Sequence, residues 1–386
     1  SGKGRPKDGE SEKEFAVRSS EKIEKFKNDH RHTLYREYLK IIAAHWPSVF
    51  VMENVKGILS SRHNGELIFP TIRKDLENPA EVFPSKGKSH KYKIHSLVVQ
   101  SKTGEVGDLQ PKDFLIKAED YGIPQKRHRV ILIGIRDNVE SSHLRILKKV
   151  KEMRNVTDVI GDLPRLTPGL SKGKLPSPFE ALKSIRNMPW WNKLLRSPEY
   201  GKIAVEMELG FEKCLKQENR GNRFLKPSKT LGDEWYADAK LHGVCNHETR
   251  SHIAEDLWRY YFSAVYAKKL GISAHLRNFP KELYPKHRNV EEAVKGTKFG
   301  DRFRVQLKNQ PATTVISHIS KDGHYFIHYD PEQYRSLTVR EAARIQTFPD
   351  NYFFEGPRTK QFHQVGNAVP PKLAYKISEI VSEILG

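Results

Sequence analysis

Three short segments of this chain combine residue types that could carry out chemistry. The first, Glu53-Asn54-Val55, directly follows the apolar run 49–52. A short apolar run behind an amphipathic helical pattern is typical of a buried parallel strand, and open α/β sheets bind ligands at the carboxyl ends of their strands. There the carboxyl group of Glu53 could exchange a proton with a ring nitrogen. The tripeptide by itself favours the alternative, a strand-end glutamate in an ordinary salt bridge.

The second segment, Gln125 to Val130, leads into the apolar run 130–135. Gln125, Arg127 and Arg129 alternate, so an extended backbone would place these three side chains on one face. An unpaired arginine is costly to bury, and guanidinium pairs well with carboxylate, phosphate or base oxygens. We therefore interpret the segment as a ligand-binding edge rather than a solvated charged edge.

The third segment, Gln364 to Pro371, precedes an apolar pattern that predicts a final helix over 373–385. Its two prolines fix the approach of the chain to that helix, and Gly366 allows close passage of the backbone. Asn367 could form a hydrogen bond with a small ligand. Taken alone, capping of the helix by Asn367 is the better interpretation.

The spacing of apolar residues predicts the elements that position these segments. Up to about residue 165 the pattern is that of a doubly wound α/β sheet protein. The predicted elements are a helix from Thr33 that Pro47 stops, strands over 49–52, 92–99 and 130–135 with a turn at 120–124, a helix over 253–269, a hairpin of strands 312–319 and 325–329, and a helix that Thr338 caps with Glu341 at its third position. These elements place the first two segments at the ends of sheet strands.

The composition indicates a basic, folded protein. The chain holds 67 Lys and Arg against 47 Asp and Glu, a net charge of +20, which would attract a polyanion. Nucleic acid is the natural candidate, and a generally basic protein with no such partner is the alternative. Two cysteines give no disulfide framework, and no apolar run is long enough to span a bilayer. We expect a cytoplasmic protein with no membrane association.

In this order the three segments resemble the DNA (cytosine-5) methyltransferase family. The resemblance continues through residues 2–8, 35–39, 120–125 and 337–349, and it covers roughly 1–8, 33–165 and 311–386. It implies an α/β fold, with a partial Rossmann-like S-adenosylmethionine-dependent methyltransferase domain and a second, smaller target-recognition domain. The implied bounds are 1–165 for the incomplete catalytic domain, 166–310 for the target-recognition domain, and 311–386 for a hinge that returns to the catalytic domain with a closing helix.

The resemblance also implies a reaction. In this family a cysteine thiolate adds to C6 of a cytosine that is flipped out of duplex DNA, and S-adenosyl-L-methionine gives its methyl group to C5. Glu53 matches the glutamate that binds N3 and the exocyclic amine of the base, with Asn54 beside it in the catalytic set. Arg129 matches the arginine at O2 of the cytosine. Arg127 would brace this site or a phosphate.

The remaining implied contacts are with the cofactor and with double-stranded DNA. Asn367 and Val369 match the final segment that lines the S-adenosyl-L-methionine pocket. A bacterial or phage-encoded protein is the expected setting. The residues expected to contact DNA are Gln125, Lys3, Arg5 and Arg250.

The region before the predicted 253–269 helix allows alternatives. Arg250 could read guanine or hold a phosphate, or its polar loop could simply cap the helix. Cys245, His247 and His252 lie close together in the sequence. A structural zinc site needs four ligands, usually with paired cysteines, so we expect no metal site.

The sequence departs from the family at its beginning. The family's glycine-rich cofactor loop and Pro-Cys nucleophile would precede Ser1, and no Pro-Cys dipeptide occurs among the 386 residues. Cys214 and Cys245 lie in the expected recognition region, so we expect neither to be the nucleophile and the chain alone to be inactive. A separate N-terminal chain that carries the loop and the nucleophilic Cys would explain the departure, as would truncation of a single-chain enzyme. The alternative function is a non-catalytic DNA-recognition subunit of a split methyltransferase.

Overall fold

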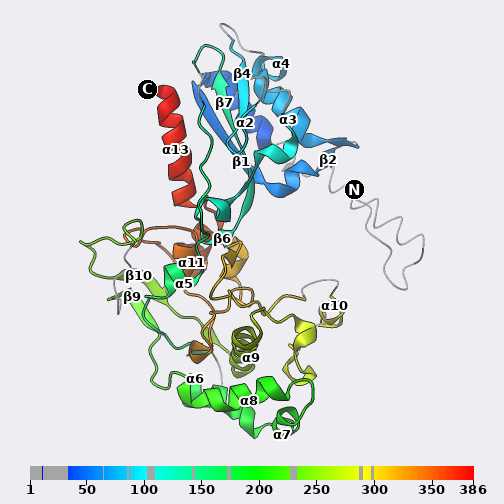
Figure 1. The fold of residues 1–386 in the computed structure, drawn as a ribbon, viewed down its shortest axis with the longest axis vertical. Helices are drawn as coiled ribbons and strands as arrows, with labels where there is room; N and C mark the ends of the chain where they lie inside the picture. Colours follow the sequence, from blue (N-terminus) through cyan, green and yellow to red (C-terminus); the bar gives the residue numbers. More distant parts are fainter. Residues whose placement is uncertain are drawn as a thin grey trace. The chain divides into compact units, whose positions relative to one another are not determined.

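The computed structural model describes residues 11, 34–63, 65–84, 87, 89–101, 109–140, 144–171, 175–226, 233–286, 290–296 and 300–386. They form two compact units (Figure 1). The first unit holds the described residues up to Lys117 together with His128–Lys148 and Lys376–Gly386, and the second holds Ala118–Arg127 and Lys149–Tyr375. The chain therefore passes from one unit to the other after residues 117, 127, 148 and 375. Lys3 and Arg5, two of the predicted DNA contacts, lie outside the described residues.

The first unit is built on an antiparallel sheet. The sheet has the strand order β1-β7-β4, and β5 also pairs with β7. The predicted helix from Thr33 and the predicted strands at 92–99 and 130–135 are confirmed as α2, β4 and β7. The elements of this unit are α2 (Leu34–His45), β1 (Val49–Val55), β2 (Arg62–His63), β3 (Glu66–Leu67), α3 (Ile68–Glu77), α4 (Pro79–Val82), β4 (Tyr92–Ser96), β5 (Leu115–Lys117) and β7 (His128–Arg136).

Strand β1 divides its residues between core and surface. Phe50 and Met52 belong to the core that α2 and α3 complete, whereas Val51 and Val55 are 37% and 55% exposed. The prediction of a buried parallel strand is therefore wrong, because β1 pairs antiparallel with β7 and buries only alternate residues. The strand also continues through Val55, so Glu53 lies within the strand and not beyond its end.

The second unit holds two apolar clusters, one of which surrounds a long helix. Its elements are β6 (Gln125–Lys126), α5 (Thr157–Ile160), β8 (Gly169–Leu170), α6 (Pro178–Lys183), α7 (Trp191–Leu195), α8 (Gly201–Gly210), β9 (Gly221–Leu225), β10 (Val244–Glu248), β11 (Ser251–His252), α9 (Ala254–Leu270), α10 (Val290–Val294), β12 (Ala312–Thr313), α11 (Val339–Ile345), α12 (Arg358–Asn367) and the first part of α13 (Pro371–Leu385). Helix α13 confirms the predicted final helix, and it begins two residues earlier than predicted.

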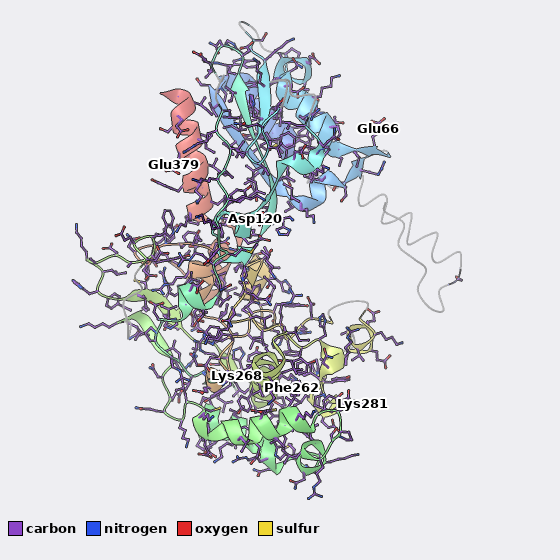
Figure 2. All side chains as sticks on the ribbon, in the orientation of Figure 1. Glu66, Asp120, Phe262, Lys268, Lys281 and Glu379 are labelled. Atoms are coloured by element: carbon purple, nitrogen blue, oxygen red, sulfur yellow. The ribbon has the colours of Figure 1, made fainter. Side chains whose placement is uncertain are left out.

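Helix α9 is the long helix, and it confirms the prediction over 253–269 with a displacement of one residue. Glu255 and Asp256 in its first turn offset the positive end of the helix dipole. The helix ends at Leu270, and the next residue, Gly271, caps it with a φ of 70° that suits glycine. Most of the helix is buried, and Figure 2 shows Phe262 among the side chains of this unit.

The predicted hairpin of 312–319 and 325–329 is wrong. Of its first strand only β12 forms, and β12 pairs in parallel with β6 rather than with the chain that follows it. Ser317 begins a short 3₁₀ helix that packs against α12. This packing requires Gly366, because a Cβ there would lie 2.3 Å from the carbonyl carbon of Ile316 and from the amide nitrogen of Ser317. The predicted close passage of the backbone at Gly366 is thus confirmed.

The predicted cap of α11 is also confirmed. The hydroxyl of Thr338 accepts the amide N–H of Glu341 at 3.2 Å, and the carboxylate of Glu341 accepts the amide N–H of Thr338 at 2.8 Å. The same carboxylate accepts two hydrogen bonds from Arg335, of 2.8 and 2.6 Å. Both charged side chains are only 1% exposed. The capping carboxylate is therefore also half of an ion pair that is closed off from solvent.

A buried histidine beside this cap predicts how stability depends on pH. His247 donates from Nε2 to the carbonyl of Pro164 and accepts the Thr338 hydroxyl at Nδ1, each at 2.9 Å, and burial lowers its pKa to about 4. In the unfolded chain its pKa would be about 6.5, so the unfolded state takes up the proton first as the pH falls. The free energy of unfolding should therefore fall by about 3 kcal/mol between pH 6.5 and pH 4 because of His247.

Urea unfolding at a series of pH values would measure this dependence. The His247→Gln variant should show a shallower decrease toward low pH. The slope should not vanish, because burial also lowers the pKa of His328 to about 4. An identical slope in the variant would contradict the assignment to His247.

Candidate active site

Glu53 and Arg129 form an ion pair on neighbouring strands of the first unit. Arg129 lies opposite Val55 in the β1–β7 register, and Glu53 lies two residues before Val55, so the two side chains share one face of the sheet. Nε of Arg129 is 2.9 Å from Oε1 of Glu53. The side chains are 17% and 32% exposed, respectively. The structure thus brings together two residues that the sequence presents 76 positions apart.

This pair has the chemistry to hold a planar, polar ring. A carboxylate accepts hydrogen bonds from an amine or a protonated ring nitrogen, whereas a guanidinium donates to a carbonyl oxygen. Arg129 also donates from Nη1 to the carbonyl of His128 at 2.9 Å, which fixes the orientation of its fork. Because both side chains stay partly exposed, a ligand can reach the pair without unfolding the sheet.

Asn54 is occupied by local backbone. Its Oδ1 accepts the amide N–H of Val55 at 2.8 Å. In a strand, neighbouring side chains point to opposite faces, so Asn54 and Glu53 do not face the same ligand. A catalytic part for Asn54 stays a prediction.

Gln125 and Arg127 do not share a face with Arg129, and this part of the sequence interpretation is corrected. The amide N–H of Arg127 bonds the carbonyl of Gln125 at 2.9 Å, which makes a three-residue turn and interrupts the extended backbone. The extended pattern resumes in β7, which contains Arg129. The alternation on which the prediction rested therefore does not exist here.

Both residues are tied into the second unit instead. Gln125 is fully buried, and its amide accepts the N–H of Val315 at 3.0 Å and donates to the carbonyl of Ile345 and to the side chain of Gln346. Arg127 is 4% exposed and donates to the carbonyl of Val315 at 2.9 Å. This conformation does not offer Gln125 to DNA. No local sequence pattern indicates that Gln125 bonds Val315 and Gln346, since these partners lie some 190 to 220 positions further along the chain.

Asn367 and Val369 lie where α12 ends and the short connection to α13 begins. Asn367 is the exposed last residue of α12, a helix that the sequence did not predict, and Val369 is 36% exposed. Gln346 holds the connection by donating to the carbonyls of Val365 and Ala368 at 3.0 and 2.6 Å. The two predicted cofactor residues thus occupy a short, braced turn at the surface of the second unit.

Neither cysteine has the character of a nucleophile. Burial raises the pKa of the Cys214 thiol to about 12 and also raises that of Cys245. A thiol attacks as its thiolate, so both groups would be almost wholly protonated near neutral pH. The ring nitrogens of His247 and His252, which lie near Cys245 in the sequence, have hydrogen-bond partners within the protein. In the part of the chain that the structure describes, no cluster of three His, Cys, Asp or Glu could hold a metal ion.

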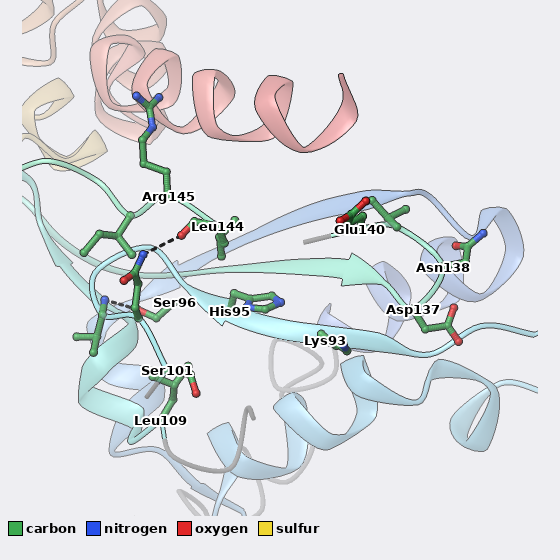
Figure 3. Close-up of a pocket in the computed structure, with 14 residues that line it drawn as sticks. Lys93, His95, Ser96, Ser101, Leu109, Asp137, Asn138, Glu140, Leu144 and Arg145 are labelled. Carbon is green, nitrogen blue, oxygen red and sulfur yellow. Dashed lines mark hydrogen bonds between the residues drawn. The ribbon is translucent and has the colours of Figure 1, made fainter. Parts of the chain in front are cut away.

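A hollow of about 1010 Å³ also lies in the first unit (Figure 3). Lys93 and His95 of β4 line it, with Leu144 and Arg145 from the segment that follows β7. Gln100 donates to the carbonyl of Leu144 at 3.1 Å at its border. Neither Glu53 nor Arg129 lines this hollow, so it is separate from the ion pair.

The chain belongs to the C-5 cytosine-specific DNA methylase family, which it matches over residues 19–383. The family is the one that the three sequence segments resemble. Among the described residues, no helix is both long and apolar enough to cross a bilayer.

Named relatives show the extent of the similarity. The type II methyltransferase M.Bpa9945I of Bacillus paralicheniformis is 31% identical over 360 residues, which are 92% of this chain and 65% of that protein. The DNA (cytosine-5-)-methyltransferase M.ApeKI of Aeropyrum pernix is 24% identical over 93% of this chain and 76% of its own length. The type II methyltransferase M.Eco47II of Escherichia coli is 53% identical over 109 residues, 28% of this chain and 25% of that protein.

A solved structure of a candidate DNA modification methyltransferase encoded within an E. coli prophage aligns with 92% of this chain and 75% of its own, with a TM-score of 0.49 and 18% identity. The chain spans about two thirds of the length of M.Bpa9945I.

Proposed function

We propose that this chain binds and orients the target cytosine for C5 methylation of duplex DNA. The observation that carries the proposal is the partly exposed Glu53–Arg129 pair in a chain of the C-5 cytosine-specific DNA methylase family. In the proposed complex the Glu53 carboxylate accepts hydrogen bonds from the exocyclic amine and from the protonated N3 of a flipped cytosine, and Arg129 donates to O2. Charge that develops on the ring during addition is then met by groups already in place.

S-adenosyl-L-methionine is the proposed methyl donor, and it supplies an electrophilic methyl group when bound. The residues proposed to line part of its site are Asn367 and Val369. An exposed amide and an exposed apolar side chain, held on a braced turn, fit a ligand that needs both a hydrogen bond and apolar contact. We further propose that the first unit contains part of a Rossmann-like catalytic domain and that residues 166–310 of the second unit recognise the DNA target.

The nucleophilic thiol of the reaction is proposed to come from outside these 386 residues. The reason is chemical: the raised pKa values of Cys214 and Cys245 disfavour the thiolate at both positions. The thiol could belong to the same polypeptide or to a separate chain. A non-catalytic DNA-recognition subunit is the second candidate function, and the lack of a reactive thiol in both cysteines favours it over an enzyme that is complete in this chain.

A trapping experiment tests the absence of a nucleophile. Duplex DNA with 5-fluorocytosine holds a thiol adduct at C6, because the fluorine at C5 cannot leave as a proton does. We expect the 386-residue chain with S-adenosyl-L-methionine to give no adduct on a denaturing gel, while an active cytosine-5 methyltransferase on its own fluorinated site gives one.

The opposite results are equally informative. An adduct with this chain alone would overturn the inference, and its loss in Cys214→Ser or Cys245→Ser would identify the thiol. If this chain contributes to catalysis, an adduct should form once a polypeptide that carries a Pro-Cys segment is added. A chain that binds the duplex yet never supports an adduct would instead be a recognition subunit.

A further inference from the structure

Three arginines from separate segments gather in the second unit. Arg220 directly precedes β9, Arg250 lies between β10 and β11, and Arg358 is the first residue of α12. All three are partly exposed. Their grouping follows from two sets of contacts.

The first set joins Arg250 to Arg358. The guanidinium carbon of Arg250 lies 3.9 Å from the centre of the Phe362 ring. Phe362 follows Arg358 by four residues in α12, so the two side chains lie on one face of that helix. Arg250 is thus held against the helix face that also presents Arg358.

The second set joins Arg220 to Arg250. Arg220 donates from Nη2 to the carbonyl of Thr249 at 3.1 Å, and its own carbonyl accepts the amide N–H of Thr249 at 2.9 Å. Its guanidinium covers Gly169, where a Cβ would lie 2.5 Å from Cζ of Arg220. The absence of a side chain at Gly169 therefore leaves space for the guanidinium of Arg220. That guanidinium contacts Thr249, the residue before Arg250.

The cluster carries positive charge without an ion-pair partner among the described residues. Burial, with the charge of Arg358 acting in the same direction, lowers the pKa of Arg250 to about 10, against the opposing influence of Tyr260 and Asp322. Burial and the charge of Arg220 lower the pKa of Arg358, against the opposing carboxylate of Glu248. Arg335 and Arg344, by contrast, are buried with carboxylates at 2.6 Å or less. In the part of the chain that is described, Arg220, Arg250 and Arg358 have no carboxylate at such a distance, so their guanidinium groups can bind an anion.

We propose that Arg220, Arg250 and Arg358 bind a backbone phosphate of duplex DNA, an inference that rests on the proposed function. Guanidinium groups match phosphate oxygens with paired hydrogen bonds. Helix α12 adds the positive end of its dipole, since its first turn has no acidic residue. Arg250 cannot extend to read a base, because its Nη atoms donate to the carbonyls of Ile319 and Lys321 while the guanidinium stacks on Phe362.

Binding of the full chain to duplex DNA across a range of salt concentrations tests this site. Arg358→Gln should bind about tenfold more weakly, and the slope of log affinity against log salt should decrease by about 1, as for the loss of one phosphate contact. Duplexes of unrelated sequence should lose affinity equally. Arg358→Lys should keep most of the slope. The matched control is Arg277→Gln, at an exposed arginine of the same unit, which should bind as the wild type does.

Thermal unfolding without DNA shows whether Arg358→Gln is folded. Its midpoint should equal or exceed that of the wild type, because the substitution removes repulsion from Arg220 and, among the described residues, the Arg358 side chain forms no hydrogen bond or ion pair that could be lost. If the folded variant binds with wild-type affinity and slope, the phosphate site is refuted while the role of Glu53 stands. A loss of affinity for one DNA sequence only would also refute the phosphate site, since that result would indicate that Arg358 contacts a base. Failure of the wild-type chain to bind any duplex would overturn both proposals.

Discussion

Replacement of Glu53 by glutamine is expected to lower methyl transfer by about 10²- to 10³-fold, the usual effect of removing one group that stabilises charge in the transition state. Glutamine keeps the size of the side chain but loses the charge that pairs with Arg129 and opposes positive charge at N3. The assay is incorporation of labelled methyl groups into duplex DNA by this chain together with the polypeptide that supplies the nucleophile. The loss should fall on kcat more than on KM, because the interaction strengthens as the ring gains charge.

The matched control is Glu66→Gln, which removes another exposed carboxylate of the first unit. Glu66 projects from the β2–β3 hairpin in Figure 2 and should tolerate the change. The Arg129→Ala variant should lose a comparable factor, and the double variant should lose less than the product of the two if the pair acts as a unit. A Glu53→Gln enzyme with wild-type activity would remove Glu53 from the site.

The largest expected effect on stability comes from Glu341. Burial alone would raise the pKa of Glu341, but Arg335 beside it holds that pKa well below its usual value. Glu341→Gln leaves the guanidinium of Arg335 buried and without its counter-charge, at a cost of about 3–5 kcal/mol in the free energy of unfolding. Urea unfolding followed by circular dichroism would measure the difference at neutral pH.

A double substitution and a surface control make this prediction specific. Arg335→Met combined with Glu341→Gln should recover part of the loss, because no buried charge is then left alone. Glu37→Gln breaks the exposed pair of Glu37 with Lys40 and should change stability by less than about 1 kcal/mol. Equal losses in Glu341→Gln and Glu37→Gln would contradict the assigned cost of the buried charge.

Local signals allowed several elements to be predicted from the sequence. Thr338 and Glu341 cap α11 through atoms only three residues apart, so their spacing carries the whole interaction. The long apolar pattern that became α9 was equally clear. Helix α12 was missed because it is mostly polar and buries little beyond Phe362, Val365 and Gly366.

Pairings between distant segments could not be predicted in the same way. Nothing local indicates that Glu53 meets Arg129, because their contact depends on the antiparallel register of β1 with β7. The false hairpin has the same origin, since β12 pairs with β6, almost 190 residues earlier. The candidate site residues could be predicted from the sequence, whereas the contact between Glu53 and Arg129 follows from the β1–β7 register.

The residues 118–127 have a consequence for how relatives could exchange parts of their genes. These ten residues belong to the second unit, although the segments that flank them in the sequence, up to Lys117 and from His128, belong to the first. A recombination event that replaced only 149–375 would require the incoming sequence to offer Gln125 a backbone donor and Arg127 a backbone acceptor, as Val315 does here. Inheritance of a new second unit therefore requires either that 118–127 be replaced together with 149–375 or that the donor sequence already satisfy these buried hydrogen bonds.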